Sequence, residues 1–262
     1  MRLAIVGASG RVGRAVVGLA HASGTQIVCA VGMSDIGRDA GDVAGIGAIG
    51  TCIVDGLAAL EHARADVVID FSAPSGTLGL ASIAAHAGSA IVSGTTGLGV
   101  DARAALERAS KQIPVLWEPN MSLGVHVLGR LVSQAVAMLT DWDVEIVETH
   151  HRAKVDAPSG TALLLAESVR AGRATTVTPV VHGRHGSLGP RPTDEIGMHA
   201  LRGGDVAGDH TVHLLGGGER IELTHRATNR EVFARGALRA ANWIVTRSAG
   251  LYTMYDVLGV KR

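Results

Sequence analysis

The turn that follows the first apolar run constrains the fold more than any other feature of this sequence. Residues 3–6 predict a β-strand, residues 11–22 predict a helix, and the segment 7–13 (GASGRVG) joins them with glycine at every third position. In this setting a glycine-rich turn brings backbone amides and the positive end of the helix close to a pyrophosphate. Ala8 stands where the stricter dinucleotide fingerprint has its first glycine. The segment therefore predicts a Rossmann-like fold whose turn binds a dinucleotide. The alternative is a glycine-rich strand-to-helix turn that binds no ligand.

The rest of the first third alternates strand-like and helix-like segments, which is typical of parallel βαβ units. The predicted strands are residues 26–31, 67–71, 90–93 and 115–117, and the predicted helices are 77–87 and 101–111, the second capped by Asp101. This pattern predicts an α/β fold with a doubly wound parallel sheet. The loops 70–74 and 93–97 follow two of the strands and would border the ligand crevice, although ordinary turns explain them equally well.

The pattern changes after Asn120 and predicts a second, α+β domain with a mixed or antiparallel sheet. Its predicted helices are residues 122–139 and 161–171, and its predicted strands are 144–150, 177–181, 195–201, 208–215 and 220–226. Three glycines at 216–218 indicate an antiparallel hairpin between the last two strands. The loop 184–194 has the length of a lid or an interface segment. A final helix, residues 232–247, is expected to return to the first domain.

Charge and composition exclude several classes of protein. Lys and Arg together number 24, as do Asp and Glu, whereas a nucleic-acid binder or a polybasic membrane-surface protein normally has a basic excess. Hydrophobic residues are 47% of the chain, yet no apolar run reaches the roughly 18 residues of a membrane-spanning helix. The first strand begins at Leu3 and leaves no room for a signal peptide. We therefore expect a cytoplasmic protein that binds neither nucleic acid nor membrane, with Cys29 and Cys52 as buried, reduced thiols.

The densest group of polar residues is the segment 148–161 (ETHHRAKVDAPSGT), which begins at the end of a strand and finishes at the start of a helix. Ser159 is predicted to cap that helix, which leaves the amides of Gly160 and Thr161 free to bind a carboxylate. Cationic and proton-donating side chains occupy four of the five positions in the stretch 150–154. The segment therefore predicts a site for a small anionic ligand with a proton source beside it.

Lys154 is one of only three lysines in a chain whose other basic residues are arginines. Lysine can release its proton whereas arginine cannot, so this residue indicates proton transfer or a compact charge, with an exposed lysine in a cationic loop as the alternative. The adjacent His150 and His151 do not predict a metal site, because neighbours in an extended segment point to opposite sides and no further ligand pattern accompanies them. We expect no bound metal.

The stretch 31–35 (VGMSD) ends the second predicted strand, where the group that reads the ribose of a dinucleotide is normally found. It has no carboxylate at the immediate end of the strand. Arg11, Arg14 and Arg38 lie near it in the sequence. The sequence therefore tolerates NADPH and leaves the choice between NADPH and NADH open.

Six segments together carry a family resemblance. They are GASGRVGR at 7–14, SGTTG at 93–97, EPNMSLGV at 118–125, HHRAKVDAPSGTA at 150–162, GDVAGDHT at 204–211 and ERIELTHRAT at 219–228. Through them the chain resembles, over nearly its whole length, the 4-hydroxy-tetrahydrodipicolinate reductase family, also called dihydrodipicolinate reductase. The segment 150–162 is highly specific to that family, and the glycine-rich turn is much less so.

The resemblance implies an oxidoreductase of the diaminopimelate route to lysine. Such an enzyme reduces 4-hydroxy-tetrahydrodipicolinate, a small dicarboxylate, to tetrahydrodipicolinate with NADPH or NADH and loses water. It also implies a dinucleotide-binding domain of residues 1–121 and 232–262, and a substrate-binding and oligomerisation domain of residues 122–231. Such enzymes are typically homotetramers assembled through the sheet of the second domain.

The resemblance assigns roles to individual residues. His150 becomes the acid/base residue and Lys154 the second proton donor, while His151 and the amides of Gly160 and Thr161 bind the substrate carboxylates. The residues implied to contact the dinucleotide are Gly7, Ala8, Ser9, Gly10, Arg11, Val12, Gly94, Thr95, Thr96, Glu118, Pro119, Asn120 and Met121.

Two departures from the family pattern concern the dinucleotide. Gly32 and Met33 stand where members often carry an acid followed by a base, and Glu118 and Pro119 stand where many have a small residue. Two other functions fit parts of the sequence. A different two-domain dehydrogenase of the amino-acid or homoserine type would share the Rossmann start but not the segment 150–162. A dinucleotide-sensing regulator without turnover would need no proton donor beside a carboxylate site.

Overall fold

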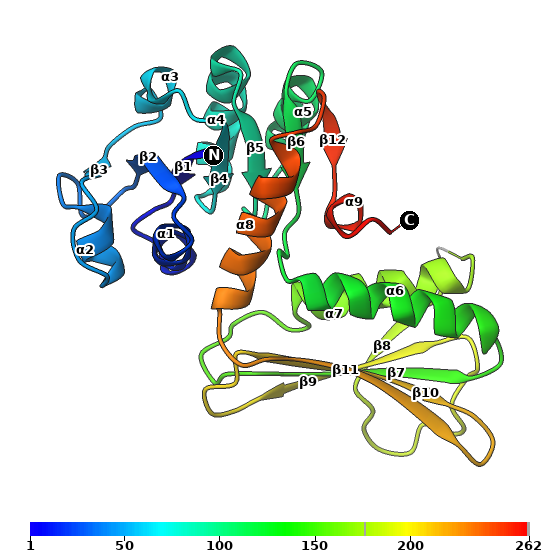
Figure 1. Cartoon of the computed structure of the whole chain (residues 1–262). Coiled ribbons are helices and arrows are strands. Elements are labelled where there is room, and N and C mark those ends of the chain that lie inside the picture. Colours follow the sequence, from blue (N-terminus) through cyan, green and yellow to red (C-terminus); the bar gives the residue numbers. More distant parts are fainter. Residues whose placement is uncertain (176, 261–262) are drawn as a thin grey trace. The chain divides into compact units, whose positions relative to one another are not determined.

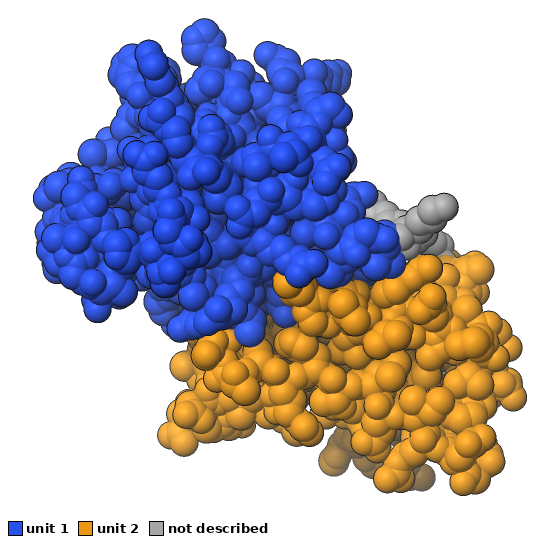
Figure 2. Space-filling model, in the orientation of Figure 1, with its two compact units in different colours: residues 1–122, 231–262 blue, residues 123–230 orange. Residues whose placement is uncertain are grey.

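The computed structural model describes residues 1–175 and 177–260 (Figure 1). The chain divides into two compact units (Figure 2). Unit 1 is Met1–Ser122 with Glu231–Arg262, and unit 2 is Leu123–Arg230. Each unit has a sheet of its own.

Unit 1 is built on a seven-stranded parallel sheet with the strand order β12-β6-β5-β4-β1-β2-β3. The strands are β1 (Arg2–Val6), β2 (Gln26–Val31), β3 (Ile53–Val54), β4 (Val67–Asp70), β5 (Ala90–Ser93), β6 (Pro114–Trp117) and β12 (Gly250–Tyr252). The chain moves outwards from β1 to β3 and then crosses to β4 on the other side of β1. The predicted doubly wound parallel sheet is therefore confirmed. The sequence did not predict β3 and β12, which are too short to give a periodic pattern.

Helices cover both faces of this sheet (Figure 1). They are α1 (Arg11–Ala22), α2 (Ala40–Ala44), α3 (Ala59–Ala63), α4 (Pro74–Ala87), α5 (Val100–Ala109), α8 (Glu231–Ile244) and α9 (Met254–Leu258). Apolar residues of α3, α4 and α5 form one core with Ala4 and Val6 of β1. Leu3 and Ile5 of the same strand are also buried and point to the opposite face, because side chains alternate along a strand. As predicted, α8 returns to this unit, where it packs on α1 and the central strands.

Two helix starts differ from the sequence-based expectation. Gly99 is the N-cap of α5, and Asp101, predicted as the cap, lies in the first turn, where its charge favours the helix dipole. Helix α4 begins at Pro74 rather than at Thr77, because proline is well suited to the first turn, where no intrahelical N–H bond is needed.

Glycine is required where the turn after β1 meets its neighbours. Gly7 has a φ of +83°, and a Cβ there would overlap the backbone carbonyl of Phe71. A Cβ on Gly13 would overlap the carbonyl of Gly7. The start of α1 therefore lies against the turn itself, an approach that only glycine permits.

Unit 2 has a five-stranded mixed sheet with the strand order β11-β10-β7-β9-β8. Its strands are β7 (Asp143–His150), β8 (Val180–His182), β9 (Ile196–Arg202), β10 (Gly208–Leu215) and β11 (Arg220–Ala227), and its helices are α6 (Leu123–Met138) and α7 (Gly160–Gly172). The predicted hairpin across residues 216–218 is present, with β10 and β11 antiparallel. The predicted strand at 177–181 begins only at Val180. Position 176 lies outside the described residues.

Burial alternates strictly along β7, so one face of this strand is buried and its first half is apolar. Val144 and Ile146 are buried against α6 and α7, together with residues such as Val132, Leu165 and Val212. The odd-numbered residues of β7 point to the other face and are half-buried. The sheet therefore has one face covered by helices and one face that these helices leave open (Figure 1).

The loop between β8 and β9 is tied to that open face by ion pairs. Arg184 and Arg191 both donate to Glu145 of β7, and His199 of β9 lies 2.7 Å from the same carboxylate. Burial raises the pKa of Glu145, but the hydrogen bonds of the two arginines and the histidine outweigh it and lower the pKa to about 2. The predicted lid or interface segment is thus anchored along one side of the sheet.

The remaining expectations concern cysteines and membranes. Cys29 is buried as predicted, and its burial raises the pKa of the thiol. Cys52 is exposed, contrary to expectation, because it lies beside β3 at the edge of the sheet. In the described part of the chain, no helix has the length and apolar character needed to cross a membrane.

The two glycines of α1 are expected to respond oppositely to the same substitution. Gly13→Ala introduces a clash with the carbonyl of Gly7 and should lower the free energy of unfolding by about 1–3 kcal/mol. Gly18→Ala meets only Ile46, at 3.8 Å, and should raise it by about 0.5–1 kcal/mol through helix propensity. Urea denaturation of both variants measures the difference. Equal effects would contradict the role given to Gly13.

Candidate active site

The predicted site residues fall into two groups, one in each unit. The first follows the carboxyl ends of β1, β5 and β6 in unit 1. The second extends from the end of β7 to the start of α7 in unit 2. Each group is built by a strand end and the loop that follows it.

A cavity of about 330 Å³ lies in unit 1 at the carboxyl ends of β1, β2 and β4. Gly7, Ser9 and Gly10 line it, together with Gly32 and Met33 after β2. The cavity therefore lies over the point where the strand order reverses, which is the usual ligand crevice of an open parallel sheet.

The first turn of α1 faces this region with unpaired backbone donors. Gly10 is the N-cap and supplies no side chain, and the first turn holds no acidic residue. The first N–H groups of a helix have no partners within it, so they and the helix dipole favour an anion. Ala8 is buried and its N–H donates to Val31, whereas Arg11 and Val12 begin the helix. This arrangement fits the pyrophosphate of a dinucleotide.

The end of the cavity beside β2 has no room for an acidic side chain at position 32. A Cβ on Gly32 would come within 2.8 Å of Ile53 and 2.9 Å of Ser9. The nearest carboxylate along the chain is Asp35, and it is paired with Arg14 at 3.4 Å and Arg38 at 2.5 Å. Asp35 is thus the one acidic residue of the segment 31–35, and the guanidinium groups of Arg14 and Arg38 lie beside it.

The other predicted cofactor residues follow β5 and β6. Gly94, Thr95 and Thr96 come directly after β5, and residues 118–121 come directly after β6. Trp117 donates its Nε1–H to the carbonyl of Thr95, at 3.0 Å, and so ties the two loops together. They border the same edge of the sheet as the glycine-rich turn, although they do not line the cavity itself.

The chemical group in unit 2 begins at the end of β7. His150 and Glu148 are two positions apart on the strand, so both point to its buried face. His150 Nδ1 lies 2.6 Å from Glu148 Oε2. A carboxylate in this place fixes the orientation and the tautomer of the imidazole.

Glu148 is fully buried and its carboxylate is fully engaged. Arg202 at the end of β9 donates to both of its oxygens at 2.7 Å, and the N–H of Ser159 donates at 3.0 Å. Burial raises the pKa of Glu148, but the hydrogen bonds from Arg202, His150 and Ser159 outweigh it, so the pKa lies below its ordinary value. Glu148 is therefore an ionised hydrogen-bond acceptor at neutral pH.

His150 is a neutral imidazole because it is buried. Burial lowers its pKa, and although the hydrogen bond to Glu148 raises it, the net pKa lies below the ordinary 6.5. Because Glu148 accepts, Nδ1 carries the ring proton and Nε2 keeps its lone pair. Nε2 faces Gly208, where a Cβ would come within 3.0 Å. Glycine at that position leaves space beside the reactive nitrogen.

A second histidine, His210 of β10, packs beside His150. The two rings are 5.1 Å apart at 76°, and His210 Nε2 lies 2.9 Å from Ser159 Oγ. Burial lowers the pKa of His210 to about 3. His210 is therefore neutral at working pH and serves to hold Ser159.

Ser159 is the N-cap of α7, as predicted. Its hydroxyl accepts from the N–H of Ala162 at 3.2 Å. Gly160 and Thr161 are the first two residues of the helix, and the side of Gly160 where a Cβ would lie is open. Their amides are at the positive end of the helix, where a carboxylate binds favourably.

Lys154 and His151 each have a partner in unit 2. Lys154 Nζ lies 2.7 and 2.8 Å from the two oxygens of Asp156, and this hydrogen bond lowers the pKa of Asp156. Arg230 donates to His151 Nε2 at 3.0 Å. The lysine is therefore held close to the loop 151–159 rather than extended into solvent, with 18% of its side chain exposed.

Comparison with known proteins identifies the family. Two family models, described as the N-terminus and the C-terminus of dihydrodipicolinate reductase, match residues 1–121 and 124–258. The chain belongs to the dihydrodipicolinate reductase family.

Relatives of known name support this membership over the whole chain. A 4-hydroxy-tetrahydrodipicolinate reductase from Myxococcus xanthus (strain DK1622) is 46% identical over 268 residues, which cover 100% of this chain and 99% of the relative. Another, from Anaeromyxobacter sp. (strain Fw109-5), is 49% identical over 266 residues, which cover 100% and 98%. A dipicolinate-bound dihydrodipicolinate reductase from Paenisporosarcina sp. TG-14 has the same fold, with a TM-score of 0.79 at 23% identity and coverage of 98% of both chains.

Sequence reasoning missed part of the network around His150. Glu148 lies on the same strand face as His150, a signal that the period of two could have supplied. His210 stands within the segment 204–211, which carries part of the dihydrodipicolinate reductase resemblance. Arg202 and Arg230 gave no signal, because each is more than fifty residues from its partner.

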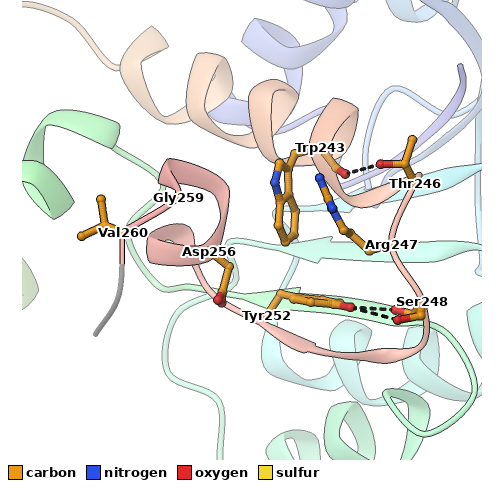
Figure 3. A pocket seen from close by; sticks show the side chains of 8 residues that line it. All are labelled: Trp243, Thr246, Arg247, Ser248, Tyr252, Asp256, Gly259 and Val260. Atoms are coloured by element: carbon orange, nitrogen blue, oxygen red, sulfur yellow. Dashed lines mark hydrogen bonds between the residues drawn. The ribbon is translucent and has the colours of Figure 1, made fainter.

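A larger hollow in unit 1 contains none of the predicted site residues. It has a volume of about 780 Å³ and lies beside the end of α8 (Figure 3). Its side chains contact one another: Arg247 lies over the ring of Trp243, and Tyr252 packs edge-on to Trp243 and donates to the carbonyl of Ser248. Within the described ranges, no group of three or more His, Cys, Asp or Glu residues is arranged to hold a metal ion.

The buried His210 predicts a pH dependence of stability. Its pKa is about 3 in the folded protein against an ordinary 6.5, so the unfolded chain binds a proton more readily between these values. Lowering the pH from neutrality to 5 should therefore cost about 2 kcal/mol of stability. His210→Gln, which can still hydrogen-bond to Ser159, should lose that share of the pH dependence. Urea denaturation at both pH values tests this, and an unchanged dependence in the variant would contradict it.

Proposed function

We propose that this chain catalyses the reaction named by its family, the NADPH- or NADH-dependent reduction of 4-hydroxy-tetrahydrodipicolinate to tetrahydrodipicolinate with loss of water, in the diaminopimelate route to lysine. The observation that carries the proposal is the segment 148–161, in which a carboxylate-held histidine adjoins a lysine and the N-terminal turn of α7. Family membership and relatives at 46–49% identity support the assignment.

His150 is proposed to exchange a proton at Nε2. Its pKa lies below 6.5, so the ring is neutral at working pH and the lone pair of Nε2 is available to accept a proton. Glu148 stabilises the cation that results, because its carboxylate lies 2.6 Å from Nδ1. Lys154 is proposed as the second proton donor. Its bond to Asp156 keeps the ammonium group within the same loop.

A dicarboxylate substrate needs two anion sites. The amides of Gly160 and Thr161 at the start of α7 are proposed as one, and His151 with its neighbour Arg230 as the other. The related enzyme from Paenisporosarcina sp. TG-14 is named as dipicolinate-bound, which supports a planar dicarboxylate as the substrate class.

The dinucleotide is proposed to bind in unit 1, where it would supply the hydride. The turn 7–12 would hold its pyrophosphate, and the loops 94–96 and 118–121 would contact the rest. Unit 1 and unit 2 would thus be the dinucleotide-binding and the substrate-binding and oligomerisation domains. We further propose a cytoplasmic homotetramer assembled through the open face of the unit 2 sheet, without nucleic-acid or membrane partners.

The alternatives account for less of the structure. Another amino-acid-type dehydrogenase would share the glycine-rich turn of unit 1 but would have no need of the segment 148–161. A dinucleotide sensor would need neither a neutral histidine poised on a buried carboxylate nor a helix start beside it. The reductase uses both.

Removing either proton-transfer group should abolish most of the turnover. His150→Gln and Lys154→Ala are each expected to lower kcat at least about a hundredfold, the usual contribution of a general acid or base. Dinucleotide binding should persist, because neither residue is among the proposed dinucleotide contacts. The assay generates substrate with the preceding synthase and follows dinucleotide oxidation by absorbance.

Lys111→Ala provides the matched control, because Lys111 is exposed and belongs to unit 1. It should leave kcat near the wild-type value. Near-normal kcat in His150→Gln or Lys154→Ala would refute the role given to that residue. An inactive wild-type protein that binds dinucleotide tightly would favour the sensor.

The segment 31–34, which ends and follows β2, carries no acidic side chain, and this predicts that NADPH is accepted. Met33 lines the cavity and its side chain is exposed, so Met33→Asp should place a carboxylate near a 2′-phosphate and raise KM for NADPH about fivefold or more, with little effect on NADH. Leu251→Asp adds the same charge on β12, at the opposite edge of the sheet, and should change neither value. A strong preference of the wild type for NADH would contradict the expectation.

A further inference from the structure

Asp70, the last residue of β4, has a fully buried side chain that collects five hydrogen bonds. Its Oδ1 accepts from the N–H and the hydroxyl of Ser72, at 3.0 and 2.6 Å. Its Oδ2 accepts from the hydroxyls of Thr77, Ser93 and Thr95, at 2.6, 2.8 and 3.0 Å. One carboxylate therefore joins the turn after β4, the first turns of α4 and the turn after β5.

The turn 93–97 is held at further points around this carboxylate. The N–H of Gly94 donates to the carbonyl of Asp70 at 2.8 Å, and Trp117 donates to the carbonyl of Thr95. A Cβ on Gly94 would overlap the ring of Phe71, so the turn lies directly against the end of β4. Its conformation therefore depends on Asp70 through both main-chain and side-chain contacts.

The topology tells which part of a dinucleotide this turn would meet. The glycine-rich turn after β1 lies at the reversal of strand order, and β2 on one side reads the adenosine ribose. Strands β4 and β5 lie on the other side of β1, so their turns face the nicotinamide half. This step depends on the proposed function only in taking the ligand to be a dinucleotide.

We propose that Asp70 is a positioning residue for the nicotinamide half of the dinucleotide. Its side chain is inaccessible to ligand, so it acts through the turn 93–97, whose residues Gly94, Thr95 and Thr96 are the proposed contacts. By accepting from Ser93 and Thr95 together, it holds both hydroxyls inwards and leaves the backbone of the turn to present the binding surface.

Aspartate suits this place better than its closest substitute. In Asp70→Asn the amide oxygen can still serve the N–H of Ser72, which leaves the NH₂ group facing three hydroxyls that donate in the native protein. An NH₂ group has two hydrogens, so two hydroxyls at most can turn round to accept from it, and the third loses its partner. The turn should loosen while the size of the side chain is conserved.

The experiment measures, by calorimetry on the full-length chain, the Kd of the dinucleotide that the wild type binds more tightly and the Kd of its adenosine fragment. The fragment is 2′,5′-ADP for NADPH or ADP-ribose for NADH. Asp70→Asn is expected to raise the Kd of the dinucleotide about tenfold or more, while the Kd of the fragment changes less than about twofold. Thr77→Val, which removes one donor from α4, should raise the ratio of the dinucleotide Kd to the fragment Kd by about threefold.

Ser89→Ala is the matched control. Ser89 is also buried and donates to the carbonyl of Ala65 at 2.7 Å, but it precedes β5 and so lies at the opposite end of the sheet. This variant loses a buried hydrogen bond of the same unit and should leave both Kd values unchanged. It separates a general loss of stability from a local effect on the turn 93–97.

The outcomes decide between positioning and mere stability. Equal weakening of dinucleotide and fragment, or an unchanged ratio in folded Asp70→Asn and Thr77→Val proteins, would overturn the proposal. If Asp70→Asn does not fold, Thr77→Val carries the test. If the wild type binds dinucleotide but does not oxidise it with synthase-generated substrate, the proposed reductase function is wrong. The two Kd values can still be measured in that case, so the role of Asp70 is tested independently.

Discussion

The fold of unit 1 depends on the close approach of backbone segments at the carboxyl edge of its sheet. Gly7 lies against the carbonyl of Phe71, Gly13 against the carbonyl of Gly7, and Gly94 against the ring of Phe71, with no space for a Cβ at any of the three glycines. The turns after β1, β4 and β5 therefore form one continuous layer made mainly of main chain. A ligand bound there meets amide groups held in place by packing, which suits a pyrophosphate better than flexible side chains would.

Unit 2 obtains its chemistry from side chains instead. Along the buried face of β7 the residues change from Val144 and Ile146 to Glu148 and His150. A buried carboxylate is costly unless it is paired, and here Arg202 engages both oxygens of Glu148. The strand is thus anchored by its apolar half in the core under α6 and α7, and its polar half is held rigidly by an ion pair from the neighbouring strand.

The sequence was informative wherever the determinant was local. The periodicity of α1 and the cap at Ser159 correctly located two helix starts, and the period of two in β7 placed His150 at a strand end. The predicted cap at Asp101 was wrong, because an aspartate is favoured both at the N-cap and in the first turn of a helix, so its presence in the sequence does not distinguish the two positions. The partners of Glu148 and Asp70 could not be predicted, since Arg202 is 54 residues from Glu148 and Thr95 is 25 from Asp70. Such contacts follow from strand order, which no local pattern contains.

Asp70 and Glu148 show how a fully buried carboxylate can serve different purposes. Asp70 ends β4, Glu148 lies two residues before the end of β7, and each accepts an N–H from the loop or helix cap nearby. The other donors to Asp70 are hydroxyls, which do not titrate near neutral pH, so this acid can fix geometry but cannot influence a proton. Glu148 contacts an imidazole, so the same kind of burial also determines which nitrogen of His150 holds the proton. The difference in donors therefore gives unit 1 the task of holding a ligand in position and unit 2 the task of holding a proton.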